Sequence, residues 1–340
     1  MIEFDPTLVH EWLARSAKRY PEKEAIICGK QRLKYSELNE YTNAFSSSLI
    51  SHGMSRGDRA VIFADNSIET VISLYAVLKA GGIFSVIEAT IKGKKLSYIL
   101  NNSGARFLIA HVNKAPVVAE AFKHSDHNCT VIWVGERKGL PLPNSSLHWD
   151  ALMTEGKDAQ VVFPRCIDID LAALIYTSGS TGEPKGVMST HHNIISAARS
   201  IIQYIENEKD DIVIDFLPLS FDYGLYQVIM TFMFGGTIIL EKSMVYIQEI
   251  LQHISQEKVT GLPIVPTVLA MLLKLKHVEN IDLSSVRYIT NTGAALPVTH
   301  IRRLRQLFPH VKILSMFGLT ECKRVCYLPP KAIDHKPGSV

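Results

Sequence analysis

Apolar and polar positions alternate along the chain in two ways that predict different elements. Residues 59–63, 83–87 and 107–110 form short apolar runs with the length and composition of buried strands. Residues 69–79 and 115–122 instead repeat apolar side chains every three or four positions, as amphipathic helices do. Strands that alternate with helices predict a mainly parallel sheet covered on both faces.

A second alternating series follows. Its strand-like runs are residues 211–215, 236–240, 259–262, 286–290 and 312–315. We therefore expect an α/β fold with two stacked lobes, lobe A at about residues 46–196 and lobe B at about residues 1–45 plus 197–335. Residues 136–170 have weak periodicity and Pro and Asn near their start, so they are expected to form a surface excursion.

The segment 176–186 reads Tyr-Thr-Ser-Gly-Ser-Thr-Gly-Glu-Pro-Lys-Gly. Its glycines allow positive φ and close approach to a ligand, its hydroxyls donate hydrogen bonds, and Lys185 adds a positive charge. An apolar run at 171–176 precedes it, and a helical pattern over 193–202 follows. Strand, loop and helix in this order predict a phosphate-binding loop. The alternative is a flexible Gly/Ser linker, which requires neither the Pro-Lys-Gly ending nor the flanking elements.

The spacing of this segment excludes one class of nucleotide loop. A P-loop needs Gly, Lys and Ser or Thr to be contiguous, whereas Glu183 and Pro184 separate Gly182 from Lys185. A Walker-type NTPase is therefore disfavoured. The whole string instead resembles the signature of the adenylate-forming ligases, the superfamily of acyl-CoA synthetases, luciferases and peptide-synthetase adenylation domains.

Further motifs strengthen this resemblance. Residues 33–38 (Leu-Lys-Tyr-Ser-Glu-Leu) and 78–84 (Leu-Lys-Ala-Gly-Gly-Ile-Phe) are similar to two structural elements of the family. Residues 290–297 (Thr-Asn-Thr-Gly-Ala-Ala-Leu-Pro) resemble the stretch whose backbone lies on adenine, and 317–321 (Phe-Gly-Leu-Thr-Glu) resemble its Tyr-Gly-x-Thr-Glu motif. The resemblance covers nearly the whole chain and implies the large N-terminal domain of such a ligase, with two α/β lobes.

The resemblance also implies roles for individual residues in joining a carboxylate to ATP. Glu321 would anchor Mg²⁺, Thr320 would donate to the α-phosphate, and Phe317 would stack on adenine. Glu321 beside Thr320 has the alternative role of a helix-start pair. The loop residues expected to bind phosphate are Thr177, Ser178, Gly179, Ser180, Thr181, Gly182 and Lys185, and the backbone expected at adenine is Thr292, Gly293, Ala294 and Ala295.

Residues 218–226 bear on the acid substrate. Phe221-Asp222 resembles an element of amino-acid-activating relatives in which the Asp pairs with an ammonium group, and Tyr226 follows one turn later. A buried carboxylate needs a cation, so Asp222 predicts an amine substrate if it lines the pocket. The alternative is Asp222 as the N-cap of a helix over 223–234. Lys323 or Arg324 would pair with a second carboxylate of the substrate, which favours an acidic amino acid or β-amino acid. The alternative is that both side chains are simply solvated at the surface.

Bulk properties exclude several classes. The 340 residues include 36 basic and 33 acidic ones, a net charge of +3, and we see no stripe for nucleic acid and no polybasic membrane segment. The N-terminus lacks a secretory signal and the apolar run 228–240 is too short to span a bilayer, so we expect a cytoplasmic protein. Five scattered cysteines favour reduced thiols rather than a metal site.

The expected function is ATP-dependent activation of a small carboxylic acid to an acyl-adenylate, for transfer to CoA or the phosphopantetheine thiol of a carrier protein. Family members continue for about 150 to 200 further residues, so the resemblance places a C-terminal lid domain and its catalytic Lys outside this sequence. We expect slow or absent turnover by this chain alone, with a missing C-terminal half as a candidate partner. The alternatives are a fatty or aryl acyl-CoA synthetase fragment and a non-catalytic nucleotide-binding remnant.

Overall fold

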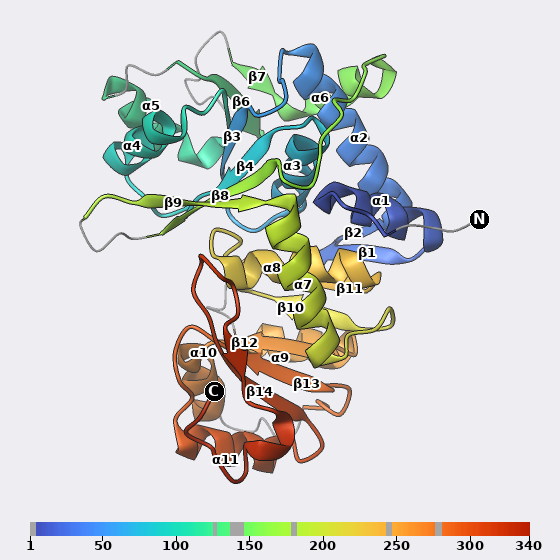
Figure 1. Cartoon of the computed structure of the whole chain (residues 1–340), viewed down its shortest axis with the longest axis vertical. Coiled ribbons are helices and arrows are strands. Elements are labelled where there is room, and N and C mark those ends of the chain that lie inside the picture. Colours follow the sequence, from blue (N-terminus) through green and yellow to red (C-terminus); the bar gives the residue numbers. More distant parts are fainter. Residues whose placement is uncertain (1–4, 125–127, 137–145, 178–181, 243–246, 276–280) are drawn as a thin grey trace. The chain divides into compact units, whose positions relative to one another are not determined.

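The computed structural model describes residues 5–124, 128–136, 146–177, 182–242, 247–275 and 281–340 (Figure 1). The chain divides into two compact units, each of which has its own sheet. Unit 1 consists of Met1–Glu22, Lys34–Ile195 and Pro218–Phe221; unit 2 consists of Lys23–Leu33, Ser196–Leu217 and Asp222–Val340.

The sheet of unit 1 has the strand order β7-β6-β5-β3-β4-β8-β9. All neighbouring strands are parallel except the last pair, β8 and β9. The strands are β3 (Arg59–Phe63), β4 (Ile83–Val86), β5 (Phe107–His111), β6 (Thr130–Val134), β7 (Leu147–His148), β8 (Leu171–Thr177) and β9 (Lys185–Thr190). Residues of β3, β4 and β5 are almost fully buried, as expected for parallel strands covered on both faces.

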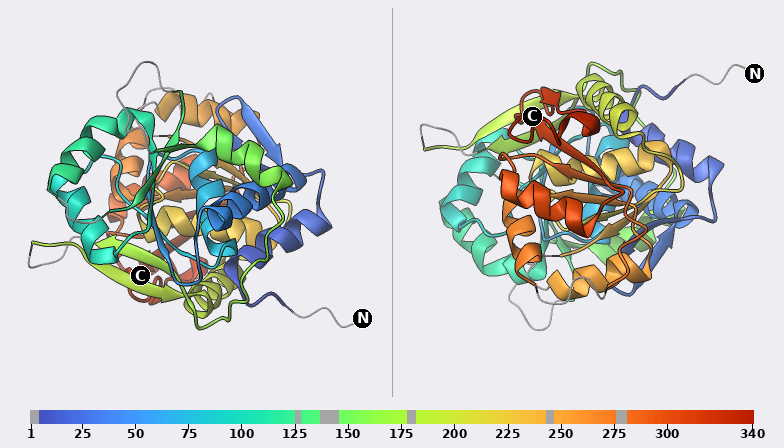
Figure 2. Two further views of the ribbon diagram at one scale, coloured as in Figure 1. Left: turned by 90° about the horizontal axis from the view of Figure 1, so that it is seen from above. Right: turned by 90° about the horizontal axis from the view of Figure 1, so that it is seen from below.

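The helices of unit 1 are α1 (Val9–Arg19), α2 (Tyr35–Ser51), α3 (Ile68–Lys79), α4 (Gly93–Ser103), α5 (Ala115–Lys123) and α6 (Trp149–Asp158), with a 3₁₀ turn at Val112–Lys114. Local sequence sets their ends: the Ser67 side chain caps α3 by accepting from the Thr70 amide, and α4 stops at Gly104, which has φ +58°. Figure 2 shows α4 and α5 on one side of the sheet and α2 and α3 on the other. Apolar side chains of α4, α5 and the central strands, including Leu100, Leu108 and Trp133, form one buried cluster.

The sheet of unit 2 has the order β15-β14-β13-β12-β10-β11-β1-β2. The strands β14, β13, β12, β10, β11 and β1 run parallel, and β15 pairs with β14 in the antiparallel direction. The strands are β1 (Glu24–Cys28), β2 (Gln31–Lys34), β10 (Ile212–Asp215), β11 (Thr237–Leu240), β12 (Gly261–Ile264), β13 (Tyr288–Asn291), β14 (Lys312–Phe317) and β15 (Cys326–Tyr327).

The helices that belong to unit 2 are α8 (Asp222–Phe234), α9 (Ile247–Gln256), α10 (Pro266–Lys274) and α11 (Val298–Leu307), followed by the 3₁₀ turn η3 (Pro330–Ala332). The division between the units falls inside α7 (His191–Ile205). Helix α8 is buried nearly all round, which agrees with its almost uniformly apolar sequence. None of the described helices is long and apolar enough to cross a membrane.

The alternation of strands and helices therefore gives the expected α/β fold with two mainly parallel sheets. Several details differ, among them the following. Residues 1–22 and 34–45, expected in lobe B, belong to unit 1, because α1 and α2 pack there against each other and against α3. The excursion 136–170 contains α6, which packs on α2. The strand β9 was not expected, because only its pairing with β8 distinguishes it from a loop.

Candidate functional site

The phosphate-binding candidate lies at the tip of the β8–β9 hairpin in unit 1. Thr177 ends β8 and is opposite Lys185, which begins β9. Ser178, Gly179, Ser180 and Thr181 fall outside the described residues. The hairpin thus brings Thr177 and the exposed Lys185 to the same end of the loop.

Two glycines of this hairpin, Gly182 and Gly186, are required for different structural reasons. Gly182 has φ +98°, a conformation that favours glycine. Gly186 is not among the residues with positive φ; a Cβ there would lie 3.2 Å from the Tyr176 ring across the hairpin. The expected order of strand, loop and helix is therefore wrong in one respect. Strand β9 separates the loop from α7, so a helix N-terminus does not follow the loop directly.

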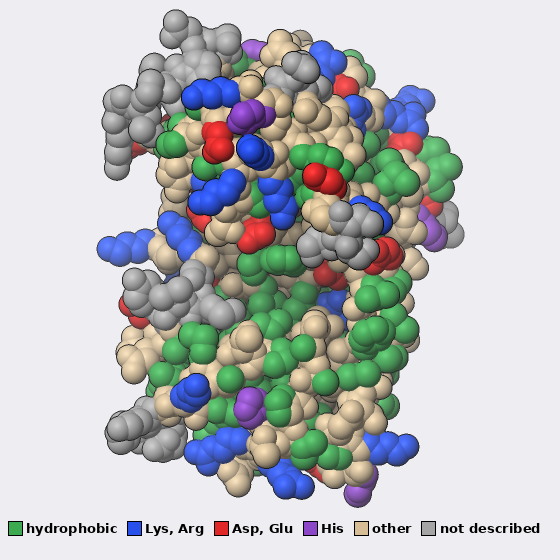
Figure 3. Space-filling view, turned by 90° about the vertical axis from the view of Figure 1, so that its left-hand side faces the viewer, with side chains coloured by type: hydrophobic (Ala, Val, Ile, Leu, Met, Phe, Trp, Pro, Cys, Tyr) green, Lys and Arg blue, Asp and Glu red, His purple; other side chains and the backbone are tan. Residues whose placement is uncertain are grey.

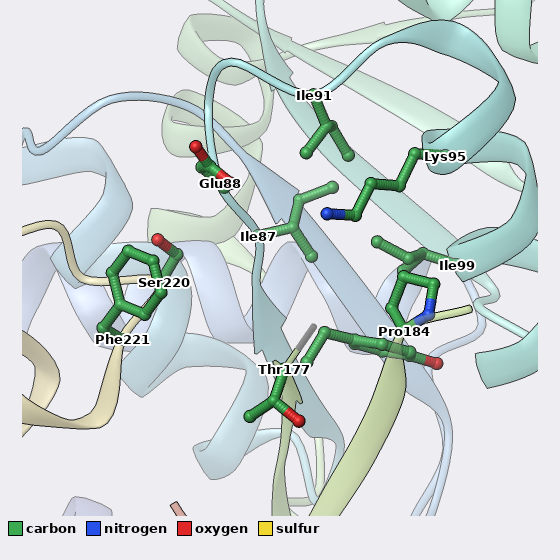
Figure 4. Close-up of a pocket in the computed structure, with 10 residues that line it drawn as sticks. Ile87, Glu88, Ile91, Lys95, Ile99, Thr177, Pro184, Ser220 and Phe221 are labelled. Atoms are coloured by element: carbon green, nitrogen blue, oxygen red, sulfur yellow. The ribbon is translucent and has the colours of Figure 1, made fainter. Parts of the chain in front are cut away.

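A pocket of about 110 Å³ adjoins the hairpin within unit 1 (Figure 4). Thr177 and Pro184 contribute one side of it, and Phe221 contributes another. The remaining lining is Ile87, Glu88, Ile91, Lys95, Ile99, Tyr176 and Ser220. Figure 4 shows the Lys95 ammonium pointing between apolar side chains into this space. The pocket therefore offers mainly apolar walls, with the cation of Lys95 and the carboxylate of Glu88, beside the start of the loop.

The adenine-binding candidates of unit 2 follow the carboxyl ends of two neighbouring parallel strands. Residues 292–295 come directly after β13, and Phe317 ends β14. The Asn291 amide group closes the turn by donating to the Ala294 carbonyl at 2.9 Å, and Gly293 has φ +86°. Phe317 is 46% exposed, which leaves its ring accessible for stacking. Ligands of parallel α/β sheets bind at this edge, so the geometry supports the expected nucleotide contact.

A tight turn after β14 presents Thr320 and Glu321. The amides of Cys322 and Lys323 both donate to the Leu319 carbonyl, and Lys323 has φ +60°. Glu321 is exposed and lies in a turn, so the alternative of a helix-start pair is wrong. Among the described residues no group of three or more His, Cys, Asp or Glu forms a metal cluster. A single exposed carboxylate nevertheless fits Mg²⁺, which commonly takes one or two carboxylates together with substrate phosphates.

The substrate candidates of unit 2 meet around a buried ion pair. Asp222 is the first residue of α8, and its Oδ2 lies 3.3 Å from Nη1 of Arg324. These side chains are only 17% and 7% exposed. The Arg324 guanidinium lies 4.9 Å from the centre of the Tyr223 ring, and the Tyr223 hydroxyl lies 2.8 Å from both the carbonyl oxygen and Oγ1 of Thr290. Asp222 therefore has a protein cation beside it at the first position of α8.

Lys323 and Tyr226 border the same ion pair. The Lys323 ammonium donates to the Thr320 carbonyl at 2.5 Å and lies 5.9 Å from the centre of the Tyr226 ring. Burial lowers the pKa of Lys323, and the charges of Asp222 and Glu321 oppose that change. The Tyr226 hydroxyl is buried without a hydrogen-bond partner in the described part of the chain. The cluster thus combines both charge signs with an unsatisfied hydroxyl.

His191 and His192 are positioned as structural residues. His191 is 2% exposed and its Nδ1 accepts from the Val9 amide at 3.0 Å, while burial lowers its pKa to about 4. His192 is exposed and lies 3.4 Å from Asp168. Packing and surface pairing, rather than catalysis, account for both.

The sequence did not predict two residues that border these sites, Tyr223 and Lys95. Tyr223 directly follows Asp222, and its position one residue into α8 was the available signal. Lys95 had no comparable signal, because only the packing of α4 near the hairpin brings it to the pocket. Phe221 lies in unit 1 and Asp222 in unit 2, so the structure assigns these neighbours to separate units.

Comparison with known proteins gives consistent matches. The family model described as AMP-binding enzyme matches residues 13–340. Bacitracin synthase 1 of Bacillus licheniformis is 26% identical over 315 residues, which are 92% of this chain but 6% of that protein. 4-Coumarate--CoA ligase 3 of Arabidopsis thaliana is 27% identical over 325 residues, 92% of this chain and 56% of that protein. The chain therefore spans only part of either curated relative.

The solved structures are similar along nearly the entire chain. The crystal structure of VinN is 29% identical, with a TM-score of 0.85 over 100% of this chain and 81% of that one. The complex of VinN with L-aspartate is 30% identical, with a TM-score of 0.83 over 97% of this chain and 80% of that one.

Proposed function

Because the chain belongs to the AMP-binding family of adenylate-forming enzymes, we propose that it activates an amino acid with a second carboxylate, by forming the acyl-adenylate from ATP. The single observation that carries the substrate proposal is the Asp222–Arg324 pair beside Lys323. A monocarboxylic fatty or aromatic acid uses its one carboxylate in the adenylate and has no further charge to offer this cluster.

The charged side chains of this cluster favour a substrate that carries both a positive and a negative charge. An ammonium group can compete for the Asp222 carboxylate, which Arg324 holds at 3.3 Å through one nitrogen rather than in a two-point fork. A second carboxylate can then pair with Arg324 or Lys323, so no buried charge is left alone. Similarity to a protein solved with L-aspartate supports this substrate class. An α-amino or β-amino dicarboxylic acid satisfies the same groups.

The chain's own residues would bind and orient the two reactants. Lys185 and the hydroxyls of the hairpin tip would hold the departing phosphates with donors fixed in advance. Thr320 would donate to the α-phosphate, and Phe317 would stack on adenine. Glu321 would hold Mg²⁺, which supplies charge neutralisation between the two anionic reactants. CoA or a carrier-protein thiol would accept the acyl group.

Binding of non-hydrolysable acyl-sulfamoyl-adenosines by titration calorimetry tests this proposal without requiring turnover. We expect the aspartyl analogue to bind at least tenfold more tightly than the alanyl and butanoyl analogues. Arg324→Gln should abolish the preference for aspartyl over alanyl, and Asp222→Asn should abolish the preference for alanyl over the deaminated analogue. The matched control Arg302→Gln, an exposed arginine of α11, should change neither ratio.

The second candidate is activation of an aromatic acid, favoured by the match to a 4-coumarate–CoA ligase. Tighter binding of a coumaroyl analogue than of every aminoacyl analogue would establish this candidate instead. Binding of ATP without binding of any of the analogues would instead support the alternative that the chain is a non-catalytic nucleotide-binding remnant.

A further inference from the structure

The charges of the chain are unevenly distributed along its sequence. Residues 283–340 contain nine Lys or Arg and only two acidic residues, whereas residues 1–282 contain 27 Lys or Arg and 31 acidic residues. The small net charge of +3 conceals this asymmetry. Its positive end lies wholly within unit 2.

Five of the nine basic residues already have partners or are buried: Arg287 pairs with Asp211, Arg305 with Asp334, Lys312 with Glu206 and Arg324 with Asp222, and Lys323 is buried. The other four are exposed, and the described part of the chain supplies no ion pair to them. Together with the exposed His310 and His335 they form what we call the basic patch: Arg302, Arg303, Lys331, Lys336, His310 and His335.

Arg305 joins the parts of the chain that carry the basic patch. Its guanidinium extends from α11 and pairs with Asp334 at 3.2 Å, while it also donates to the carbonyls of Val311 and Pro330. Arg302 lies one helical turn before Arg305, and Lys331 follows Pro330 directly. Asp334 is the acidic residue nearest in sequence to η3, and this ion pair engages it with Arg305. Figure 3 shows Lys, Arg and His side chains with little acidic surface between them at the end of unit 2 that holds α11 in Figure 1.

The basic patch is separate from the nucleotide candidates. Arg305 bonds to Val311, immediately before β14 begins, whereas Phe317 ends the same strand and Glu321 lies beyond it. A strand of this length spans about 20 Å at roughly 3.3 Å per residue. Within unit 2, the end of β14 beside Arg305 is therefore about a strand length away from Phe317 and Glu321.

We propose that the basic patch docks an acidic face of a protein partner. A nucleic acid extending past the patch meets a remainder of the chain that is net negative, which opposes binding along a polyanion. A membrane surface favours bulky apolar side chains beside the cations, and none of the large exposed apolar side chains belongs to the fully described α11 or η3. A set of exposed cations on α11 and around η3, with no aromatic anchor on either element, instead fits electrostatic steering of an acidic protein.

If the chain activates an acid as proposed above, such a partner would be the protein that carries the acceptor thiol. The position of the basic patch at the opposite end of β14 from Phe317 and Glu321 suits a docking surface rather than a contact with the small acid.

The test measures binding of the full chain to a fluorescein-labelled Glu-rich helical peptide by anisotropy. Reversing the patch with Arg302→Glu, Arg303→Glu, Lys331→Glu and Lys336→Glu should weaken the Kd at least tenfold at low salt. The matched control reverses four exposed lysines elsewhere: Lys18→Glu, Lys30→Glu, Lys157→Glu and Lys242→Glu. It changes the net charge equally and should alter the Kd by less than twofold.

Duplex DNA and vesicles of anionic phospholipid serve as competing probes. Equal or tighter binding of either probe through the same four side chains would overturn the assignment to a protein partner. So would an unchanged Kd in the patch variant, or no peptide binding by the original chain. The assay needs no catalysis, so its failure leaves the acyl-adenosine binding results of the proposed function intact.

Discussion

Lys185 is an exposed side chain whose importance rests on position rather than burial. It starts β9 opposite Thr177, at the base of the hairpin tip. Lys185→Ala should weaken ATP binding about tenfold or more, because it removes the cation that we propose to hold the departing phosphates. Binding of an acyl-sulfamoyl-adenosine, which lacks those phosphates, should change less than twofold. Calorimetry with both ligands checks this, and equal ATP affinity in the variant would contradict it.

Asp215 is a buried carboxyl group with an incomplete set of partners. Its Oδ1 accepts from the Leu217 amide at 3.0 Å, its Oδ2 has no partner among the described residues, and burial raises its pKa well above the usual range. The folded protein therefore binds this proton more tightly than the unfolded chain does. Stability from this group is complete below the unfolded pKa of about 3.9 and is lost as pH rises toward the folded pKa.

Asp215→Asn removes the ionisation while keeping the shape. Relative to the original chain, the variant should gain stability as pH rises from about 5 to 8, by at most about 1.4 kcal/mol per pH unit. Urea unfolding at both pH values measures the difference. Parallel pH dependence of the two proteins would show that Asp215 does not hold a proton in the folded state.

At the scale of elements, the turn after β14 depends on a close backbone approach. A Cβ on Gly318 would lie 1.8 Å from the carbonyl oxygen of Lys323, so the turn that presents Glu321 could not close. Gly318→Ala should destabilise the protein by about 2 kcal/mol or more, or displace the turn. Either result should reduce binding of the aspartyl analogue. Gly338→Ala is the control, because a Cβ there meets nothing within 4 Å.

Helix α1 is attached to α7 through two histidines. The rings of His10 and His191 lie 5.9 Å apart, and burial lowers their pKa values to about 3 and about 4. His191 and Lys79 add positive charge that further disfavours a proton on His10. Both histidines are thus neutral in the folded state, so the stability they contribute is present above the ordinary value of about 6.5 and is lost as pH falls through the folded pKa values.

His10→Leu removes one of these proton sites from the packed helices. The variant's melting temperature should fall less than that of the original chain between about pH 6.5 and 4, and circular dichroism at several pH values would record it. Identical slopes would mean that His10 binds no additional proton on unfolding in this range.

For the whole molecule, local patterns were sufficient to predict the α/β class, the two sheets and most strands, because apolar runs of strand length report burial directly. Local patterns were insufficient where a contact or a strand depends on residues far apart in the sequence. The Asp222–Arg324 pair joins positions 102 apart, and β9 is a strand only because β8 pairs with it. The basic patch is different: its signal was present in the sequence, but a net charge summed over the chain hides it.

The interleaving of the two units has a consequence for synthesis on the ribosome. Strand β1 pairs with β11, which is made about 210 residues later. At 5–20 residues per second this interval lasts roughly 10 to 40 s. During that time the apolar residues Ala25, Ile26 and Ile27, which are buried in the folded protein, have only β2 to pair with on one side of the strand. The nascent chain therefore carries an unpaired strand edge throughout this interval, which makes chaperone protection most valuable before β11 emerges.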